Sequence, residues 1–385
     1  MNKRTWAEVD LDAIAQNMKE IRRITDPHAK VMAVVKADAY GHGFLEITKT
    51  LLENGADCLA VALLEEAKQI RRRHIEVPIL ILGGTDPDAV DDLIDFDIMA
   101  TVFSYDFAKT LSYAAEKKNK TAKIHIKIDT GMSRVGLVAG EENSEVVREI
   151  QRIADLPNLE IDGIFSHFAT SDEEDSSYTN LQFERFMDII SLLEEKGIHI
   201  PTKHICNSAA IMMYPNMHLD MVRPGVILYG LYPSDEVDTS RLDLRPAMTL
   251  KARISMVKEI EKGRGVSYGK EYITDKTTKI ATVPIGYADG YLRKLAGKAK
   301  MIVSGTCVPV IGRICMDQCM IDVTNVHNIN TGDEVIIFGA DKITIDDVAK
   351  WLETINYEVA CVIGKRIPRI YTREGKAVKV LNYLL

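Results

Sequence analysis

Eight short apolar segments alternate with helix-like segments between about Lys30 and Tyr232, and this alternation restricts the fold more than any other feature. Each apolar segment has the length of a strand buried in a parallel sheet. The eight predicted strands are Val31–Lys36, Cys58–Ala62, Ile79–Leu82, Ile98–Val102, Ile124–Ile128, Ile161–Phe165, His204–Cys206 and Met221–Val222. The helical segments between them include Phe44–Glu53, Leu64–Arg73, Asp106–Lys118 and Gln182–Lys196.

Eight strand–helix units predict an α/β fold, specifically a (β/α)8 barrel of the TIM type. The alternative is an open, doubly wound sheet. The sequence favours the barrel, because the first strand is not followed by the glycine fingerprint of a dinucleotide-binding sheet.

The pattern changes after Tyr232. A polar segment, residues 233–240, precedes β-branched runs that are separated by Gly, Asp and Asn. These runs predict a mainly β domain and include Ile280–Val283, Met301–Val303, Val308–Ile311, Met320–Val323 and Val335–Phe338. We therefore expect residues 1–240 to form the barrel domain and residues 241–385 the β domain, with residues 1–10 packing with the β domain.

The composition excludes several classes of protein. A chain of 385 residues suggests two domains, and its net charge of −8 argues against nucleic-acid binding, which usually needs a basic excess. No apolar stretch is long enough to span a membrane, and the first ten residues lack the apolar core of a signal peptide. The six cysteines form neither a disulfide framework nor a zinc pattern. We expect a cytoplasmic protein with no metal site.

Lys36 stands at the end of the first predicted strand and is followed at once by a turn containing Tyr40-Gly-His-Gly43. An ammonium group placed in a site at a strand end loses hydration, which lowers its pKa and favours a nucleophilic amine. A Schiff-base lysine needs these properties. The alternative is a lysine that extends from the strand end into water. The paired glycines favour a site, because they allow backbone to approach a ligand closely.

The loops after the seventh and eighth predicted strands could hold a phosphate group. Asn207-Ser208 opens a short helix, and Arg223-Pro-Gly-Val226 forms a glycine-containing turn. Phosphate often binds at these two loops of a barrel. Taken alone, Ser208 is better interpreted as a helix cap. Together with Lys36, the two loops indicate pyridoxal 5'-phosphate, which carries an aldehyde and a phosphate on one ring.

The sequence closely resembles the alanine racemases, which belong to the barrel-type class of pyridoxal-phosphate enzymes. The resemblance extends from Thr5-Trp-Ala-Glu-Val-Asp10 to Arg366-Ile-Pro-Arg-Ile-Tyr371. The motifs that carry it are Val34-Val-Lys-Ala-Asp-Ala-Tyr-Gly-His-Gly43, Lys127-Ile-Asp-Thr-Gly-Met132, Ser166-His-Phe168, Asn207-Ser208, Val222-Arg-Pro-Gly225, Val266-Ser-Tyr-Gly269, Pro284-Ile-Gly-Tyr-Ala-Asp-Gly290 and Cys315-Met-Asp317. Their order across two domains is highly specific.

The resemblance implies two catalytic bases. Racemisation removes a proton from one face of the amino-acid Cα and returns one to the other face, so two bases avoid turning the substrate over. Lys36 matches the first base and Tyr268 the second. In the family this tyrosine reaches the cofactor of the partner subunit, which implies a homodimer with shared active sites. Without the resemblance, Tyr268 would be a half-buried strand tyrosine.

The resemblance also assigns the residues around the cofactor ring. Arg223 matches the arginine that faces the pyridine nitrogen, where a donor-only side chain should keep that nitrogen unprotonated. The alternative is a surface arginine before a Pro-Gly turn. His204 resembles the histidine that supports this arginine, and His167 the histidine close to the ring. For either histidine alone, a packed, hydrogen-bonded role is equally compatible with the sequence.

The remaining implied contacts concern the phosphate and the substrate. The phosphate contacts are expected from Tyr40, Ser208, Tyr357 and the backbone of Gly225 and Val226. Arg134 and the backbone N–H of Met316 match groups that bind the substrate carboxylate, with Met316 coming from the partner subunit. Tyr287 is expected to line the substrate entryway and Asp317 to tune the local charge, although both could be structural.

Lys127 matches a lysine that is carbamylated in many members of the family. We hypothesise the same here, because an unmodified Lys127 beside Arg134 would be a buried pair of like charges. Ser133 departs from the family pattern, in which glycine is common before the arginine, and this departure concerns the loop that carries Arg134.

The resemblance implies an alanine racemase that supplies D-alanine for peptidoglycan. Three alternatives remain open at this stage. A racemase for serine or a broader range of amino acids would share the site. A decarboxylase would present an acidic residue, rather than Arg223, to the ring nitrogen. A non-catalytic pyridoxal-phosphate-binding protein would lack the β domain and Tyr268.

Overall fold

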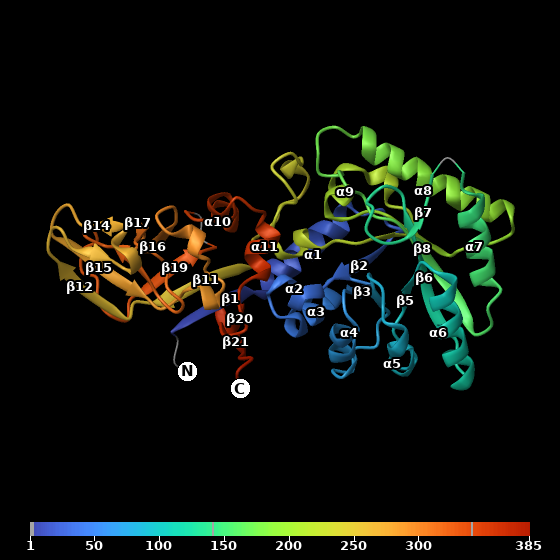
Figure 1. The fold of residues 1–385 in the computed structure, drawn as a ribbon, viewed down its shortest axis with the longest axis horizontal. Coiled ribbons are helices and arrows are strands. Elements are labelled where there is room, and N and C mark those ends of the chain that lie inside the picture. The colour runs from blue at the N-terminus through green and yellow to red at the C-terminus, as the bar shows by residue number, and fades with distance from the viewer. Residues whose placement is uncertain (1–3, 141, 340–341) are drawn as a thin grey trace. The chain divides into compact units, whose positions relative to one another are not determined.

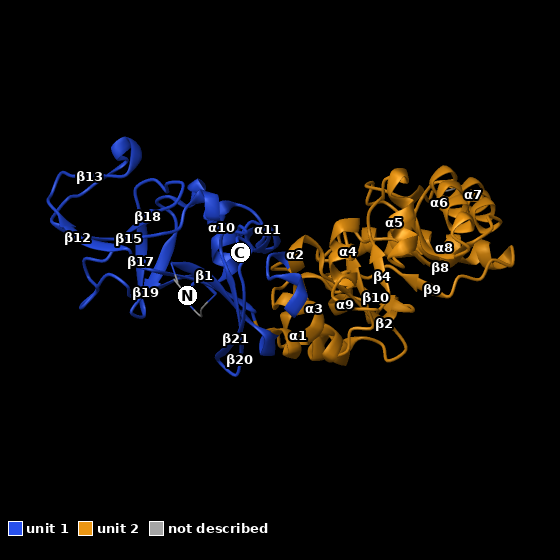
Figure 2. Cartoon of the chain, turned by 90° about the horizontal axis from the view of Figure 1, so that it is seen from below, with its two compact units in different colours: residues 1–13, 40–46, 246–385 blue, residues 14–39, 47–245 orange. Residues whose placement is uncertain are grey.

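The computed structural model describes residues 4–140, 142–339 and 342–385. They form two compact units (Figure 2). The barrel unit contains the described residues within 14–39 and 47–245, and the β unit contains those within 1–13, 40–46 and 246–385. The segment 40–46 therefore belongs to the β unit although it lies between two parts of the barrel unit in the sequence.

The barrel unit contains two groups of parallel strands, ordered β10-β2-β3-β4 and β5-β6-β8-β9. Their bounds are β2 (Lys30–Val34), β3 (Cys58–Val61), β4 (Ile79–Ile81), β5 (Ala100–Val102), β6 (Ala122–Asp129), β8 (Leu159–Phe165), β9 (Thr202–His204) and β10 (Met221–Val222). Backbone hydrogen bonds close the ring on both sides. Ile81 N donates to Met99 O (3.1 Å) between β4 and β5, and Arg223 N donates to Cys206 O (3.0 Å) between the ends of β9 and β10.

Helices surround these strands. Figure 1 shows α4, α5, α6, α7 and α8 outside the strands. The helices of this part of the chain are α1 (Leu11–Ile24), α3 (Phe44–Glu53), α4 (Leu64–Arg71), α5 (Val90–Asp95), α6 (Tyr105–Lys117), α7 (Ser144–Ala154), α8 (Ser177–Glu195) and α9 (Ser208–Met213). In α7 the buried side chains are Val146, Val147, Ile150 and Ile153, the spacing of one apolar helix face. The prediction of a (β/α)8 barrel is confirmed.

The first barrel strand ends earlier than the sequence predicted. The prediction extended it to Lys36, whereas β2 ends at Val34. Lys36 starts the segment α2 (Lys36–Tyr40), in which Ala37, Asp38, Ala39 and Tyr40 all have positive φ angles. A left-handed backbone costs about 1–2 kcal/mol for each non-glycine residue, so such a run is strained. Strain of this kind tends to gather at functional sites.

The β unit is built on a sheet with the strand order β12-β15-β18-β17-β16-β19-β11-β1-β20-β21. The strands of this unit are β1 (Thr5–Asp10), β11 (Met248–Arg253), β12 (Met256–Ile260), β13 (Gly265–Val266), β14 (Tyr272–Ile273), β15 (Thr278–Val283), β16 (Lys300–Val303), β17 (Thr306–Ile311), β18 (Cys319–Asp322), β19 (Glu334–Phe338), β20 (Arg369–Arg373) and β21 (Lys376–Leu381). Buried and half-buried residues alternate through most of β11, as expected when one face of a sheet covers a core.

Two helices complete the β unit, α10 (Ile345–Leu352) and α11 (Asn356–Cys361). The strand β1 lies inside the sheet, antiparallel to β11 and parallel to β20. The beginning of the chain is therefore part of the β unit, while residues 1–3 lie outside the described residues. None of the helices in the described part of the chain combines the length and the apolar character that a membrane crossing requires.

Candidate active site

The predicted site residues of the barrel unit lie at the carboxyl ends of its strands. Lys36 follows β2, Lys127 lies near the end of β6, His167 follows β8, His204 ends β9 and Arg223 follows β10. In enzymes with a (β/α)8 barrel, the active site lies at this end. It is built from the loops that follow the strands.

Arg223 is the centre of a buried hydrogen-bonded group. The residue is 3% exposed. Its Nη1 lies 2.7 Å from Nδ1 of His204 and its Nη2 lies 3.1 Å from Nδ1 of His167. Nη2 also donates to the carbonyl oxygens of Ser166 (2.7 Å) and Ile205 (3.0 Å). The structure thus brings together the predicted arginine and both predicted histidines.

Burial determines which of these three side chains are charged. Burial is the main cause that lowers the pKa of Arg223 to about 10, so the guanidinium stays protonated at neutral pH. Burial, and then the charge of Arg223, hold the pKa values of His167 and His204 well below their ordinary value. Both imidazoles are therefore neutral at pH 7, and both present an acceptor nitrogen to the arginine.

Lys127 is a second buried basic side chain. It is 5% exposed, its Nζ donates to the carbonyl oxygen of Ile128 (2.7 Å), and the amine lies 5.2 Å from the centre of the Phe165 ring. Burial, followed by the charge of Arg223, lowers the pKa of Lys127 to about 7. A substantial fraction of the side chain is then an uncharged amine at neutral pH.

Arg134 lies in the exposed loop after β6. The carboxylate of Asp129 organises this loop by accepting from the backbone N–H groups of Gly131 (2.9 Å) and Ser133 (3.0 Å). Ser133 has a φ angle of 57°. Glycine is favoured at such an angle, which accounts for the glycine that is common here in the family pattern; nothing in the structure explains the serine.

Ser208 joins the loops that follow β9 and β10. Its Oγ accepts from the backbone N–H of Gly225 (2.9 Å), and Val226 begins a short 3-10 turn. The interpretation of Ser208 as the helix cap is wrong, because Asn207 caps α9 and its side chain accepts from Ala210 N (3.0 Å). Ser208 is the first residue of the helix and its hydroxyl faces the other loop.

In the β unit, Tyr40 and Tyr357 lie close together. Their ring centres are 6.1 Å apart, and burial is the main cause that raises the pKa of Tyr40. Gly41 allows this arrangement, because a Cβ atom there would lie 2.3 Å from the carbonyl oxygen of Ala360 in α11. The φ angle of Gly41 is also positive, 78°. Both features require glycine at this position.

The sequence analysis missed the residues that hold this turn. Arg369 is fully buried, and its Nε donates to the carbonyl oxygen of Gly41 (2.9 Å) while Nη2 donates to that of Ile363 (2.7 Å). The hydroxyl of Tyr371 donates to the carbonyl oxygens of His42 and Gly43. Both residues end the motif Arg366-Ile-Pro-Arg-Ile-Tyr371, but nothing in that motif shows which backbone groups they bind.

Tyr268, Tyr287 and Met316 form an exposed cluster in the β unit. Their exposed fractions are 70%, 39% and 52%. Ser267 donates to the carbonyl oxygen of Arg313 (2.7 Å) and lies 3.4 Å from Sγ of Cys315. The backbone N–H of Tyr287 donates to the carbonyl oxygen of Cys315 (3.1 Å). The segment around Cys315 therefore connects the three predicted residues.

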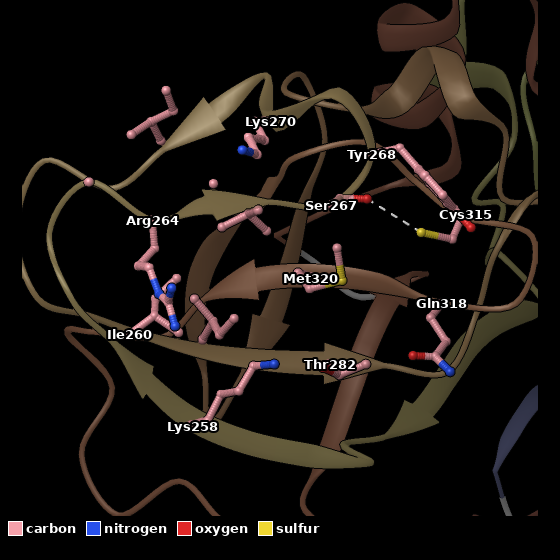
Figure 3. A pocket seen from close by; sticks show the side chains of 15 residues that line it. Lys258, Ile260, Arg264, Ser267, Tyr268, Lys270, Thr282, Cys315, Gln318 and Met320 are labelled. Atoms are coloured by element: carbon pink, nitrogen blue, oxygen red, sulfur yellow. Dashed lines mark hydrogen bonds between the residues drawn. The ribbon is translucent and has the colours of Figure 1, made fainter.

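A cavity of about 880 Å³ opens beside Tyr268 (Figure 3). Its floor comes from the sheet face that carries Ile280 and Met320, and the β13–β14 hairpin forms one side. The basic side chains Lys258, Arg264 and Lys270 also line it.

Asp317 belongs to an ion-paired group. Its Oδ1 lies 2.7 Å from Nη2 of Arg366, and its carbonyl oxygen accepts from Arg4 (2.8 Å). Arg366 also lies 3.5 Å from the buried carboxylate of Asp289. Asp317 thus ties the segment after Met316 to the rest of the β unit.

Comparisons with known proteins give matches over nearly the whole chain. The family model "Alanine racemase, N-terminal domain" matches residues 9–233, and "Alanine racemase, C-terminal domain" matches residues 247–371. "Alanine racemase 1" of Clostridium acetobutylicum is 51% identical over 382 residues, which cover 98% of each chain.

Solved structures show the same likeness. An alanine racemase from Clostridium difficile 630 has a TM-score of 0.97 at 43% identity and covers 100% of both chains. Alanine racemase from Bacillus anthracis with bound L-Ala-P has a TM-score of 0.93 at 38% identity and covers 100% of this chain and 99% of its own. From these matches over both units, we conclude that the chain belongs to the alanine racemase family.

Proposed function

We propose that this protein is a pyridoxal 5'-phosphate-dependent racemase that interconverts L-alanine and D-alanine by a two-base mechanism. The observation that carries the proposal is the buried Arg223 with two neutral imidazoles at the carboxyl end of the barrel. The names of the relatives support alanine as the substrate.

The residues of the barrel unit fit this cofactor. It needs an amine for its aldehyde, donors for its phosphate and a partner for its ring nitrogen. Lys36 would supply the amine, and Ser208 with the backbone of Gly225 and Val226 would supply phosphate contacts. In the β unit, the hydroxyls of Tyr40 and Tyr357, whose ring centres lie 6.1 Å apart, are proposed for the same role. The buried positive charge of Arg223 favours an anionic ligand over water.

The cofactor supplies an electron-withdrawing ring that makes the Cα–H bond of a bound amino acid more acidic. Arg223 sets how strongly that ring withdraws electrons. A guanidinium that stays protonated can donate a hydrogen bond to the ring nitrogen but cannot accept one, so it keeps the nitrogen unprotonated. A weaker electron sink favours prompt return of the proton to Cα over side reactions such as transamination.

Lys36 and Tyr268 would move the proton. The amine of Lys36 takes or returns a proton on one face of Cα, and the phenol of Tyr268 does so on the other. Arg134 and the backbone N–H of Met316 would hold the substrate carboxylate. The half-exposed Tyr287 would line the entryway, and Asp317, paired with Arg366, would keep the segment after Met316 in place.

We propose that Tyr268 and Met316 act on the cofactor site of a second copy of this chain in a homodimer. Exposed clusters of large side chains are typical of surfaces that bind another protein. The cluster of Tyr268, Tyr287 and Met316 has this character. Contacts of Cys315 with Ser267 and with the backbone of Tyr287 hold the cluster in place within one chain.

We further propose that Lys127 is carbamylated. Only an uncharged amine reacts with carbon dioxide, and the lowered pKa of Lys127, about 7, provides it. The modification would replace a buried positive charge beside Arg223 with a negative one. Labelled bicarbonate should give one protein-bound carbamate signal in a ¹³C spectrum, which Lys127→Ala removes. A mass spectrum of the native protein showing only the plain amine contradicts this.

The proposed product would serve peptidoglycan synthesis, which consumes D-alanine, in the cytoplasm. All six cysteines are free thiols, which fits a reducing compartment.

The test is to incubate the purified protein with its cofactor and L-alanine, D-alanine or L-serine in D₂O. Optical rotation of either alanine enantiomer should fall to zero while deuterium enters at Cα. The same incubation with L-serine measures specificity. Alanine that keeps its optical rotation and its Cα proton overturns the proposal.

A further inference from the structure

A chain of polar contacts runs from Arg223 through the barrel interior to the half-exposed side chain of Asp162. Arg223 Nη1 lies 2.7 Å from His204 Nδ1, and His204 Nε2 lies 2.9 Å from His125 Nδ1. His125 Nε2 then lies 3.4 Å from Oδ2 of Asp162. Both histidines are completely buried. The sequence analysis identified neither His125 nor Asp162.

The hydrogen-bond donors and acceptors along this row of side chains can be assigned in only one way. A protonated arginine can only donate, so His204 Nδ1 must accept and the proton of neutral His204 sits on Nε2. That proton is donated to His125 Nδ1, which places the proton of neutral His125 on Nε2. His125 Nε2–H then faces the carboxylate of Asp162. Burial lowers the pKa values of both histidines, which agrees with neutral rings.

The fold makes room for His125. In the register between β6 and β8, Ile124 pairs with Ile161 and His125 pairs with Gly163, so Asp162 is an extra residue in β8. A bulge of this kind redirects side chains. A Cβ atom at Gly163 would lie 2.3 Å from His125 Nδ1. The bulge and the glycine together allow the imidazole to lie beside His204.

The aromatic ring of Phe165 packs against both imidazoles. It stacks on His204 with ring centres 4.8 Å apart, and it meets His125 edge-on at 6.4 Å. Barrel interiors are usually filled with branched apolar residues. A row of imidazoles there is costly to bury unless each nitrogen has a partner, which requires one fixed arrangement of protons.

We propose that His125 and Asp162 are positioning residues that fix the tautomer of His204 and thereby hold Arg223 in the orientation used in catalysis. The inference rests on the proposed function, because Arg223 matters for catalysis only if it faces the cofactor ring. Neither residue touches the substrate. Their effect passes from Asp162 to His125 through the charge contact at 3.4 Å, and from His125 to His204 and Arg223 through hydrogen bonds. An outer carboxylate orients a histidine in this way in other sites.

The test combines histidine NMR with kinetics on the full-length holoenzyme. The variant Asp162→Asn keeps the shape of the side chain and removes its charge. Gly163→Ala displaces the His125 ring and leaves Asp162 in place. Glu160→Gln is the matched control. Glu160 and Asp162 both lie on β8 and near Nζ of Lys123, at 3.6 and 3.8 Å, whereas Asp162 is the one that lies beside His125.

In the wild type and in Glu160→Gln, the ¹⁵N spectra should show His125 and His204 as neutral rings protonated on Nε2. In Asp162→Asn and Gly163→Ala, both rings should populate the Nδ1-protonated form. The value of kcat should fall about 10- to 100-fold, with KM for alanine little changed. A thermal melt confirms that each variant is folded.

Two results overturn the inference. One is a wild-type His204 protonated on Nδ1, and the other is a folded Asp162→Asn whose tautomers and kcat match the wild type. Failure of the proposed function would look different. The wild-type protein would then show the expected tautomers but no racemisation of alanine.

Discussion

The buried group around Arg223 in the barrel unit and the exposed cluster of the β unit are held in opposite ways. In the barrel unit, Arg223, Lys127 and Ser208 are buried, and each is tied to backbone or side-chain partners of the same unit. In the β unit, Tyr268 and Met316 are exposed. The barrel unit thus orders its own buried groups. The β unit presents side chains that gain a role only when something binds to them.

The comparison shows how the two kinds of site are stabilised. In the barrel unit, burial is the main cause that lowers the pKa values of Lys127 and Arg223, and an anionic ligand would offset the buried charge of Arg223. The β unit leaves apolar surface in water, which a second chain would cover. We therefore expect changes in the barrel unit to affect chemistry and stability together, and changes in the exposed cluster to affect chemistry alone.

The largest effect is expected at Lys36. Replacing it with alanine removes both the amine that holds the cofactor and one of the two bases, so racemisation of either enantiomer should fall by about 10⁴-fold. Initial rates with L-alanine and D-alanine measure this. Lys30→Ala changes an exposed lysine at the start of β2, the strand that Lys36 follows, and should keep full activity. Activity of Lys36→Ala close to that of this control would exclude Lys36 from the mechanism.

The next effect is expected at Tyr268. In Tyr268→Phe the ring stays in the exposed cluster but the proton-carrying oxygen is lost, so racemisation should fall by about 10³-fold in both directions. Visible absorbance of the bound cofactor and the thermal stability should be unchanged. Tyr268 lies in the turn of the β13–β14 hairpin, and Tyr272→Phe removes a hydroxyl from β14 of the same hairpin and should remain active. Retained activity in Tyr268→Phe would show that another group supplies the second base.

Lys127 should make stability depend on pH in bicarbonate-free buffer. Its pKa is about 7 in the folded protein and about 10.4 when unfolded, so the unfolded chain binds more protons between these values. The free energy of unfolding should therefore rise with pH between about 7 and 10, by up to a few kcal/mol.

Denaturant unfolding at several pH values measures this slope. Lys127→Met should lose the rise, whereas Lys123→Met, an exposed lysine on the same strand, should keep it. The same slope in Lys127→Met as in the wild type would show that Lys127 is not the group that titrates.

The smallest effect is expected at Ser133. Glycine removes the strain of a left-handed backbone, about 1–2 kcal/mol, but loses about 0.5–1 kcal/mol through its freedom in the unfolded chain. Ser133→Gly should raise the free energy of unfolding by about 0.5–1 kcal/mol, as measured in denaturant. Ser133→Ala keeps the Cβ atom and should give no gain, so equal gains in both variants would contradict an origin in backbone strain.

Much of the barrel unit could be predicted because apolar runs of strand length alternate with helical segments. That pattern placed Lys36 and Arg223 near the carboxyl ends of strands. It wrongly placed His204 at the start of the seventh strand, whereas His204 ends β9. It could not locate the end of β2, because nothing in Ala37–Tyr40 marks a left-handed turn when glycine is absent. Nor could it separate Asn207 from Ser208 as the cap of α9, since both residue types cap helices.

The residues that the sequence could not reveal act through non-local contacts. Asp162 depends on a shift in register between β6 and β8, which leaves no trace in hydrophobic periodicity. Tyr40 lies beside Tyr357 in a turn whose Gly41 carbonyl accepts a hydrogen bond from Arg369. A buried arginine among carbonyl groups looks the same in sequence as one on the surface.

The most direct test of the central claim, that the exposed cluster of one chain serves the buried site of another, is subunit complementation. Equal amounts of the inactive variants Lys36→Ala and Tyr268→Phe are unfolded, mixed and refolded together. In a shared-site homodimer each mixed dimer has one intact site, so about a quarter of the wild-type activity should return. If the mixture stays as inactive as either variant refolded alone, while refolded wild type regains activity, Tyr268 does not act across subunits.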